Sequence, residues 1–383
     1  MDPSRFTDSS FGKAVKTPGR YGFYTFIPEP LPRSLELTSQ SVACLSRADR
    51  ALGRLAGAGR LLPNPQILVN AYVRREAVAS SRIEGTQTTI SELFEAEARG
   101  DIRGEVAEVM NYVGALNLGL ARLRELPISR RLLETIHREL LSGVRGQERA
   151  PGEVRRTPNW IGSADNTPDS AVFVPPPVDV MERGLSDWEH FMHDESMDMP
   201  PLVKCALMHY QFETLHPFLD GNGRLGRLLI IFQLISEGHL PAPLLYVSSY
   251  FESHKDEYYD RLQGVRERGE IQEWLRFFLD AVTTQAADAV TRAERILDQR
   301  EKYRDHLRGT RSRAHEVVDI LLENPFISTT IVRTRLGVSS QGATNLLRQL
   351  QDVEILQSLP RIPGRSSRWR ATELVDIIVG SSA

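Results

Sequence analysis

The chain has 383 residues, of which 25% are charged and 41% hydrophobic, and its formal net charge is −3. This composition is typical of a soluble globular protein and excludes a disordered chain. The length predicts two or three domains, and the small net charge gives no overall attraction to nucleic acid. The two cysteines, Cys44 and Cys205, form no CxxC pair, so neither a disulfide framework nor a cysteine zinc site is expected.

The N-terminus lacks the apolar segment of a signal peptide, and the longest apolar run, residues 228–235, is too short to span a bilayer. We therefore expect a cytoplasmic protein with no membrane partner. Helical periodicity runs from about residue 35 to 300 and predicts a mainly α fold. We assign 1–50 to an N-terminal arm and 51–308 to a helical domain that carries a helix at 67–85.

The main interruption of the helical pattern lies at 151–178. Two short extended pieces, around Trp160 and Val172, flank a polar turn there, which predicts a β-hairpin over 156–174.

A different pattern follows the long charged helix at 284–308. Helical segments at 314–324, 328–336 and 339–351, then two strands around a Pro/Gly/Arg turn, predict a winged helix-turn-helix domain over 309–383. Nine arginines face five acidic residues between 310 and 371, a local charge of +4. The segment is a candidate for DNA contact, with protein docking or dimerisation as the alternative. The arginines are Arg311, Arg313, Arg333, Arg335, Arg348, Arg361, Arg365, Arg368 and Arg370.

The stretch HPFLDGNGRLGR, residues 216–227, concentrates the polar chemistry of the chain. The Gly-Asn-Gly turn at 221–223 tolerates positive φ, and at the start of a helix it exposes successive N–H groups as a cradle for an anion. Arg224 and Arg227 are three residues apart on that helix, so both guanidinium groups can clamp phosphate oxygens. These features together predict a phosphate site.

Two further residues of this stretch suggest a reaction. Asp220 would repel phosphate unless a cation lay between them, which predicts a ligand for Mg²⁺ that bridges phosphates. His216 can accept a proton at neutral pH, which suggests a general base for attack by a hydroxyl on a nucleotide phosphate. No P-loop motif is present. His209, Glu213 and His216 also share one helix face, so a metal site of a metallohydrolase is the less favoured alternative.

The stretch at 216–227 matches in full the HxFx(D/E)GNGRxxR motif of the Fic family, whose members mostly transfer AMP from ATP to a hydroxyl of a target protein. The resemblance implies a helical bundle, ATP as substrate and Mg²⁺ as cofactor. It implies that His216 deprotonates the target hydroxyl, that Asp220 holds Mg²⁺, that 221–223 forms the anion hole, and that Arg224 and Arg227 bind phosphates. The segment at 156–174 resembles the family's flap, which aligns the target by main-chain pairing.

A second stretch, SSRIEGT at 80–86, is similar to the inhibitory motif (S/T)xxxE(G/N) of the same family, with Ser80, Glu84 and Gly85 matching. The resemblance implies that Glu84 pairs with Arg227 and blocks productive binding of the γ-phosphate. The inhibition would be intramolecular. In some relatives the same glutamate assists removal of AMP, so this reverse activity stays open.

Downstream, Tyr258 and Tyr259 lie in a segment that is also reminiscent of the family, and they are candidates to contact adenine and ribose. The alternative is that one of them packs between helices. The expected nucleotide contacts are Gly221, Asn222, Gly223, Arg224, Leu225, Gly226, Arg227, Ser81, Tyr258 and Tyr259.

The leading hypothesis is an autoinhibited protein adenylyltransferase, a nucleotidyltransferase that modifies a Ser, Thr or Tyr hydroxyl of an unidentified protein or of itself. Transfer of another phosphate moiety is the second reading. The third is a DNA-binding regulator that senses nucleotide through its Fic-like domain. A homodimer is expected by resemblance alone.

Overall fold

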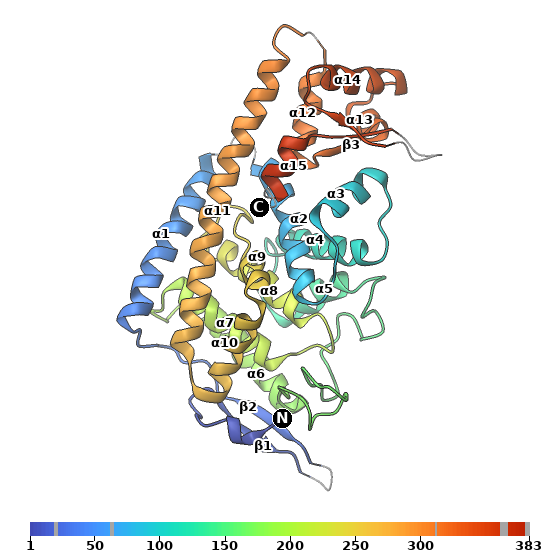
Figure 1. Ribbon diagram of the computed structural model, residues 1–383. Coiled ribbons are helices and arrows are strands. Elements are labelled where there is room, and N and C mark those ends of the chain that lie inside the picture. Colours follow the sequence, from blue (N-terminus) through green and yellow to red (C-terminus); the bar gives the residue numbers. More distant parts are fainter. Residues whose placement is uncertain (19–21, 62–64, 311, 361–366, 380–383) are drawn as a thin grey trace.

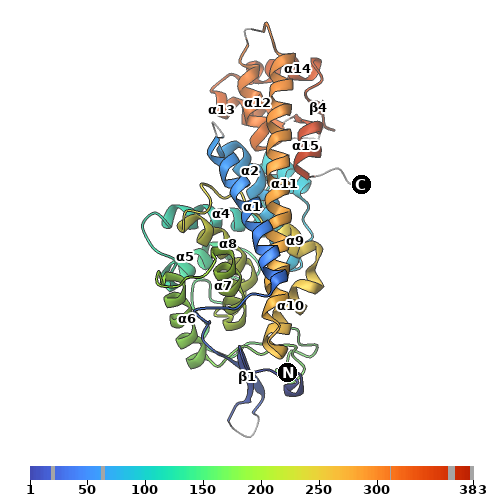
Figure 2. The same cartoon turned by 90° about the vertical axis from the view of Figure 1, so that its left-hand side faces the viewer.

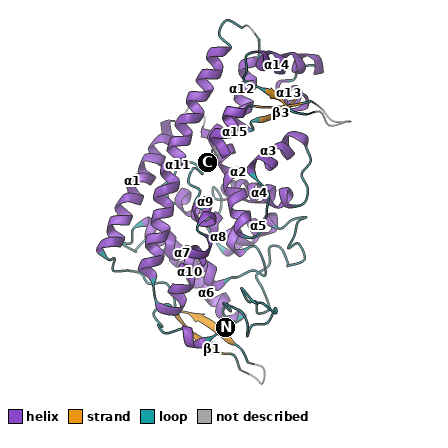
Figure 3. Cartoon of the chain, in the orientation of Figure 1, coloured by secondary structure: helices purple, strands orange, loops and turns teal. Residues whose placement is uncertain are grey.

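The computed structural model describes residues 1–383 except 19–21, 62–64, 311, 361–366 and 380–383, and it does not describe the side chains of 61–68. Helices dominate the chain (Figure 3), which confirms the mainly α fold class. The helices are η1 (Pro3–Arg5), α1 (Ser39–Leu61), α2 (Pro65–Ile83), α3 (Ile90–Arg99), α4 (Glu105–Arg122), α5 (Arg130–Leu140), α6 (Val178–His193), α7 (Pro201–Leu215), α8 (Asn222–Ser236), α9 (Ser248–Ser253), α10 (Lys255–Arg268), α11 (Ile271–His306), α12 (Ala314–Glu323), α13 (Thr329–Leu336), α14 (Ser340–Asp352) and α15 (Thr372–Val379). The strands are β1 (Gly12–Lys16), β2 (Tyr24–Pro28), β3 (Phe326–Ser328), β4 (Gln357–Ser358) and β5 (Arg368–Arg370).

Helices α7 and α8 form the centre of the core. Both carry apolar residues around their whole circumference, and nearly every residue of each is buried, as expected for a helix in the interior of a protein. The two helices pack against each other. The loop at 216–221 joins them, so both ends of this loop are held by the most buried elements of the molecule.

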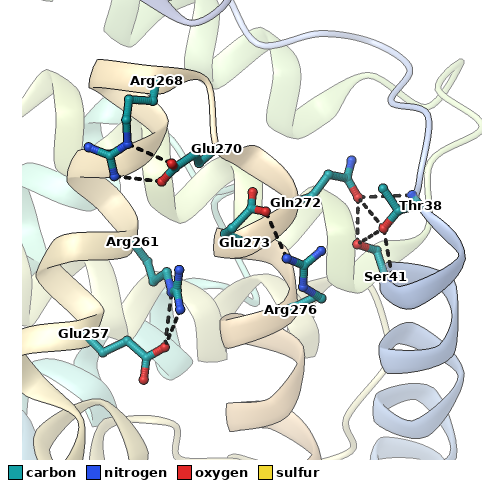
Figure 4. A network of polar contacts seen from close by, with 9 residues as sticks. All are labelled: Thr38, Ser41, Glu257, Arg261, Arg268, Glu270, Gln272, Glu273 and Arg276. Carbon is teal, nitrogen blue, oxygen red and sulfur yellow. Dashed lines mark hydrogen bonds and ion pairs between the residues drawn. The ribbon is translucent and has the colours of Figure 1, made fainter. Parts of the chain in front are cut away.

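Helices α1 and α11 run side by side along one edge of the molecule (Figures 1 and 2). Figure 4 shows how Gln272 of α11 fixes the start of α1: its Oε1 accepts a hydrogen bond from the N–H of Thr38 at 3.2 Å and from the hydroxyl of Ser41 at 2.6 Å. The ion pairs in the same view lie at the surface or are half-buried and contribute little to stability.

The C-terminal elements lie at the far end of α11 (Figure 1). Strands β3, β5 and β4 form an antiparallel sheet in that order, and α13 packs on α14. The three predicted helices are present within one or two residues of their expected bounds, whereas β3 was not predicted. The winged-helix assignment stays a prediction. The turn at 361–366, with Arg361 and Arg365, and also Arg311, lies outside the described residues.

This C-terminal region packs against α2 and α3, the helices that lie on either side of the stretch at 80–86 in the chain. Helices α12 and α15 contact α2, and β3 and α15 contact α3. Arg75 of α2 pairs with Asp288 of α11 at 3.1 Å, and Arg292, which also binds Asp288, donates a hydrogen bond to the carbonyl of Ile377 in α15 at 2.5 Å. Helix α2 is therefore connected to the C-terminal elements by packing and by a chain of polar contacts.

The N-terminal arm contains a hairpin that sequence reasoning did not predict. Strands β1 and β2 pair antiparallel with Gly12 opposite Pro28. The N–H of Phe26 donates to the carbonyl of Val174 at 2.9 Å, so the hairpin lies against the end of the segment at 156–174. A small apolar cluster separate from the main core forms at this contact.

The prediction of a β-hairpin at 156–174 needs correction. The structure has one antiparallel bridge there, between Ile161 and Phe173, instead of a ladder. Between these two residues, side chains form hydrogen bonds with backbone groups that a strand ladder would use. The carboxylate of Asp165 accepts from the N–H of Thr167 at 3.1 Å, and the hydroxyl of Ser163 donates to the carbonyl of Thr167 at 2.8 Å. Such local side-chain bonds compete with strand pairing. We keep the name flap for residues 156–174.

None of the described helices combines the length and the apolarity needed to cross a lipid bilayer.

Candidate active site

The loop at 216–221 is a tight turn closed by its own side chains. Helix α7 ends at Leu215, and His216 takes the left-handed conformation with φ of 49°. The amide of Asn222 accepts from the N–H of Phe218 at 2.9 Å and donates to the carbonyl of the same residue at 2.8 Å. The Asn222 side chain is thus used inside the loop, and only its backbone can contribute to the predicted anion hole.

His216 is buried enough to stay neutral. Burial, and after it the nearby Arg155 guanidinium, lowers the pKa of His216 to about 4. The imidazole is therefore unprotonated at neutral pH, which a general base requires. Its Nδ1 lies 3.4 Å from the carbonyl oxygen of Glu213, a weak contact.

His137 of α5 holds the loop at 216–221 by a hydrogen bond and a ring contact. This role was not predicted from the sequence. Its Nδ1 accepts from the N–H of Gly152 at 2.8 Å, so its Nε2 carries the proton and donates to the carbonyl of Asp220 at 2.9 Å. The ring also stacks on Phe218 with centroids 3.9 Å apart. Burial lowers the pKa of His137 to about 4, so the ring stays neutral. A lone histidine in a helix gives no sequence signal for this role.

The N-terminus of α8 offers a seat for an anion. Gly221 precedes the helix with φ of 76°, and no side chain in the described structure caps the first turn, so its N–H groups and the positive end of the helix dipole remain available. Arg224 is 3% exposed and its Nε is buried without a hydrogen-bond partner among the described residues. An unsatisfied buried donor beside an uncapped helix start is suited to phosphate oxygens.

Asp220 lies at the edge of this seat. Its carboxylate is 41% exposed, accepts from the N–H of Gly221 at 2.5 Å and lies 3.6 Å from the guanidinium of Arg224. Mg²⁺ is commonly held by one carboxylate together with substrate phosphates and water, so this donor fits the ion predicted from sequence. Within the described parts of the chain no three His, Cys, Asp or Glu side chains form a metal-binding group, so phosphate oxygens would have to complete the coordination.

The metallohydrolase alternative is not supported by the positions of its residues. His209 is fully buried, and its Nδ1 and Nε2 are engaged with the carbonyl of Gly226 at 3.1 Å and the hydroxyl of Tyr258 at 2.9 Å. Both ring nitrogens of His209 are therefore used within the core.

Glu84, which directly follows α2, reaches into the anion seat. Its Oε1 accepts from Nη2 of Arg227 at 2.8 Å. A Cβ built on Gly223 would collide with the Glu84 carboxylate and lie 2.9 Å from Nη1 of Arg227. The carboxylate therefore lies directly over the first turn of α8, in the place where the uncapped helix start would receive an anion.

Arg227 itself is held firmly. Its side chain is 1% exposed, whereas that of Glu84 is 32% exposed. Two further bonds tie Arg227 to Ser80: Nε donates to the hydroxyl at 2.8 Å and Nη2 to the carbonyl at 2.9 Å. Burial alone would raise the pKa of Glu84, but the charge and the hydrogen bond of Arg227, together with the charge of Arg224, lower that pKa. The pair is therefore ionised at neutral pH.

A second carboxylate lies near this arginine. Glu213 of α7 is buried, and its Oε1 has no hydrogen-bond partner in the described structure. It sits against Gly226, where a Cβ would collide with it. Burial raises the pKa of Glu213 to about 7; Arg227 opposes the rise, whereas the charge of Glu84 adds to it.

Of the two tyrosines predicted to contact the nucleotide, one is buried in the core and the other is exposed. Tyr258 is 1% exposed, its hydroxyl is bonded to His209 and its ring stacks on Phe251 with centroids 4.6 Å apart. The predicted contact of Tyr258 with nucleotide is therefore not supported, because both its ring and its hydroxyl are used in the core. Tyr259, 42% exposed, is the tyrosine of this pair that is open to a base.

Leu225, Gly226 and Ser81 also face inward. Leu225 is buried in the core, and the carbonyl of Gly226 is bonded to His209. Ser81 is fully buried, and its hydroxyl has no partner in the described structure. A nucleotide could reach Ser81 only if the end of α2 moved.

Comparisons with known proteins show what this chain is similar to. The model of the Fic/DOC family N-terminal region matches residues 42–121, and the model of the Fic/DOC family matches residues 127–234. A protein adenylyltransferase Fic of Drosophila grimshawi is 28% identical over 205 residues, covering 52% of this chain and 39% of the relative. One of Culex quinquefasciatus is 32% identical over 172 residues, covering 45% of this chain and 30% of the relative. The chain thus spans well under half the length of these relatives.

Two solved structures share the fold. A Fic family protein from Desulfovibrio desulfuricans G20 aligns with a TM-score of 0.58 at 22% identity, over 88% of this chain and 97% of that one. Fic-1 of C. elegans, residues 134–508, aligns with a TM-score of 0.50 at 19% identity, over 66% and 74% of the two chains. The matched models and the shared helical fold identify this chain as a Fic domain protein of the Fic/DOC family.

Proposed function

We propose that the protein transfers AMP from ATP to a hydroxyl side chain of a protein, and that Glu84 inhibits this transfer. The observation that carries the proposal is the arrangement at the start of α8: an uncapped helix N-terminus with a buried arginine, Arg224, whose Nε has no partner, beside a neutral imidazole, His216. The names of the adenylyltransferase relatives support the same reaction.

The reaction assigns one task to each group. Nε2 or Nδ1 of His216 takes the proton of the target hydroxyl, whose oxygen then bonds to the α-phosphorus as the bond to the β-phosphate oxygen breaks. Arg224 and the N–H groups at 221–223 hold the phosphates in line and balance their charge. Asp220 would hold Mg²⁺, which neutralises phosphate charge when bound. The products are the AMP ester and pyrophosphate, with the proton on His216.

Inhibition follows from where the Glu84 carboxylate lies. It pairs with Arg227 and sits over Gly223, so an incoming phosphate would meet a negative charge in its place and lose its arginine partner. Because the pair is ionised at neutral pH, the block persists at cellular pH. The Glu84 side chain is 32% exposed, so it has room to turn toward solvent.

The test uses the Glu84→Gly protein with Mg²⁺ and ATP labelled either at the α-phosphate or at the γ-phosphate. We expect protein-bound label from α-labelled ATP alone, and a mass increase that includes adenosine. Label from γ-labelled ATP alone would contradict the proposal and favour phosphorylation. Label from neither, in a folded protein that binds ATP, would reject transfer to the protein itself and require a screen of candidate targets.

Removal of AMP is tested with the same reagents. Purified protein labelled by Glu84→Gly is incubated with wild type after ATP is removed. Loss of label with wild type, and not with Glu84→Gly, would assign the reverse reaction to Glu84; stable label in both would leave inhibition as its role.

A further inference from the structure

We propose that Arg155 is a positioning residue that joins the general base and both ends of the flap into one rigid unit. This inference rests on the proposed function, because it assigns His216 as the base and the flap as the site that receives the target. Nothing in the sequence marks Arg155; its neighbour Arg156 is of the same type and is exposed.

The guanidinium of Arg155 donates to carbonyl oxygens from two separate segments. From the catalytic side, Nε donates to the carbonyl of His216 at 2.9 Å and Nη2 approaches that of Leu215 at 3.4 Å. From the flap, Nη1 donates to the carbonyl of Thr157 at 3.2 Å and Nη2 to that of Pro176 at 2.6 Å. Thr157 lies at the start of the flap and Pro176 two residues beyond its end, so a single side chain holds both ends and the base.

A backbone bond strengthens the same junction. The N–H of Arg155 donates to the carbonyl of Pro217 at 2.8 Å. His216 lies between the two carbonyls held at 215 and 217, and it has a positive φ of 49°, a conformation that costs a histidine energy unless its surroundings hold it. The donors of Arg155 help to hold it, together with the bond from the N–H of His216 to the carbonyl of Phe212 at 3.0 Å.

The charge of Arg155 is not balanced by an ion pair. The side chain is 2% exposed, and no ion pair of Arg155 occurs in the described part of the chain. Burial lowers its pKa to about 10, so it remains charged at neutral pH. A buried charge without a counter-ion is costly, and here backbone carbonyl dipoles stabilise it. The same charge disfavours a proton on His216.

Other charged groups near His216 act more weakly than Arg155. Arg266 of α10 also disfavours protonation, whereas Glu84 favours it. Arg266 reaches the flap as well, with its guanidinium 3.9 Å from the ring centroid of Phe173, and it donates to the hydroxyl of Thr214 at 3.0 Å. Arg266 contacts side chains at one point of the flap, whereas Arg155 holds its two ends by their backbone.

The experiment compares Arg155→Gln, Arg155→Lys and the control Arg183→Gln, each in the Glu84→Gly background. Arg183 of α6 lies outside the flap and the anion seat, is 69% exposed and lies 3.1 Å from Asp179, so its change should leave transfer unaltered. We expect Arg155→Gln to lower kcat by roughly 100-fold, the cost of a misplaced catalytic group, with KM for ATP within about twofold because Arg155 lies outside the anion seat. Arg155→Lys should recover only part of this loss, since an ammonium group cannot reach all four carbonyls.

The second readout is the titration of His216 by NMR, assigned by its absence in His216→Ala. We expect its pKa to rise by roughly one unit in Arg155→Gln and to rise less in Arg155→Lys, which keeps the charge. If the parent transfers no label to itself or to any screened target, the proposed function fails, and this titration still tests the contact. Equal kcat and equal His216 pKa in Arg155→Gln and Arg183→Gln would overturn the inference, as would equal values in Arg155→Lys and Arg183→Gln if Arg155→Gln does not fold.

Discussion

The loop at 216–221 and the stretch at 80–86 meet at the start of α8, but they are held in different ways. The loop is held by bonds to its backbone carbonyls from His137 and Arg155, both buried. Glu84, in contrast, is held through the end of its side chain by Arg227, and 32% of that side chain is exposed.

Under the proposed function, this contrast separates a permanent site, the loop at 216–221, from a removable blocker, Glu84. Moving the loop would break several buried backbone bonds, each expensive to leave unmade. Moving Glu84 requires only a change of side-chain rotamer and the loss of one charged pair, because Arg227 keeps its two bonds to Ser80. Under the proposed function, the difference means that the protein would keep its catalytic geometry intact while Glu84 blocks the anion seat.

The largest expected effect tests the loop at 216–221. His216→Ala in the Glu84→Gly background should lower AMP transfer by about 1,000-fold, within the range for removal of a general base. The rate of incorporation of α-labelled AMP measures it, and ATP affinity measured by calorimetry serves as the control for an intact seat. A loss below about tenfold would mean that another group accepts the proton.

Next in size is the removal of the blocker. Glu84→Gly should raise transfer about 10- to 100-fold, since a hydrogen-bonded charged pair contributes about 1.5–3 kcal/mol. Glu84→Gln should raise it less, because the amide still occupies the space over Gly223. The control is Glu252→Gln, which removes the partner of Arg82 at 3.5 Å beside the end of the same helix. An equal rise in Glu252→Gln would mean that loosening α2, not freeing Arg227, activates the protein.

The third prediction concerns how the stability of the fold changes with pH through the buried groups near the loop at 216–221. His137 and His209 have folded pKa values lowered to about 4 and about 3, with burial as the main cause. The unfolded chain therefore binds their protons first, and stability is lost as pH falls below about 6.5. Glu213, raised to about 7 by burial, binds its proton first in the folded state and offsets part of this loss.

Urea unfolding at pH 7.5 and 5.5 measures the balance. Between these values Glu213→Gln should lose about 1–2 kcal/mol more stability than wild type does, because the offset is gone. Equal losses in the two proteins would show that Glu213 does not hold a proton preferentially in the folded state.

The smallest effect tests how α2 is anchored. Arg75 and Arg183 each lie 3.1 Å from an aspartate, but Arg75 is 19% exposed and Arg183 is 69% exposed. Arg75→Ala should lower the free energy of unfolding by about 1 kcal/mol or more, and Arg183→Ala by less than about 0.5 kcal/mol. If Arg75→Ala also raises transfer slightly, the polar contacts with α11 and α15 help to hold the blocker in place. Equal losses of unfolding free energy in the two variants would show that the Arg75–Asp288 pair does not anchor α2.

Burial decided which of the predicted contacts keep their role. The tyrosines at 258 and 259 are equivalent by pattern, and one is buried while the other is half exposed. The flap was predicted as a hairpin from its extended pieces, but Asp165 and its neighbours use the backbone that a ladder would need. In each case the competing partner comes from packing or from side-chain bonds that a hydrophobic pattern does not report.

The sequence by itself determined the mainly α fold, the apolar helices α7 and α8 and the cradle between them, because each depends on residues that are neighbours in the chain. It also located Glu84, through a motif of consecutive residues. The family motif also predicted that Glu84 pairs with Arg227, 143 residues away, and the structure shows that contact. Only the tertiary structure brought His137 and Arg155 to the loop at 216–221, from 83 and 61 residues away. Such bonds depend on how helices pack, and a local pattern carries no record of a distant donor or acceptor.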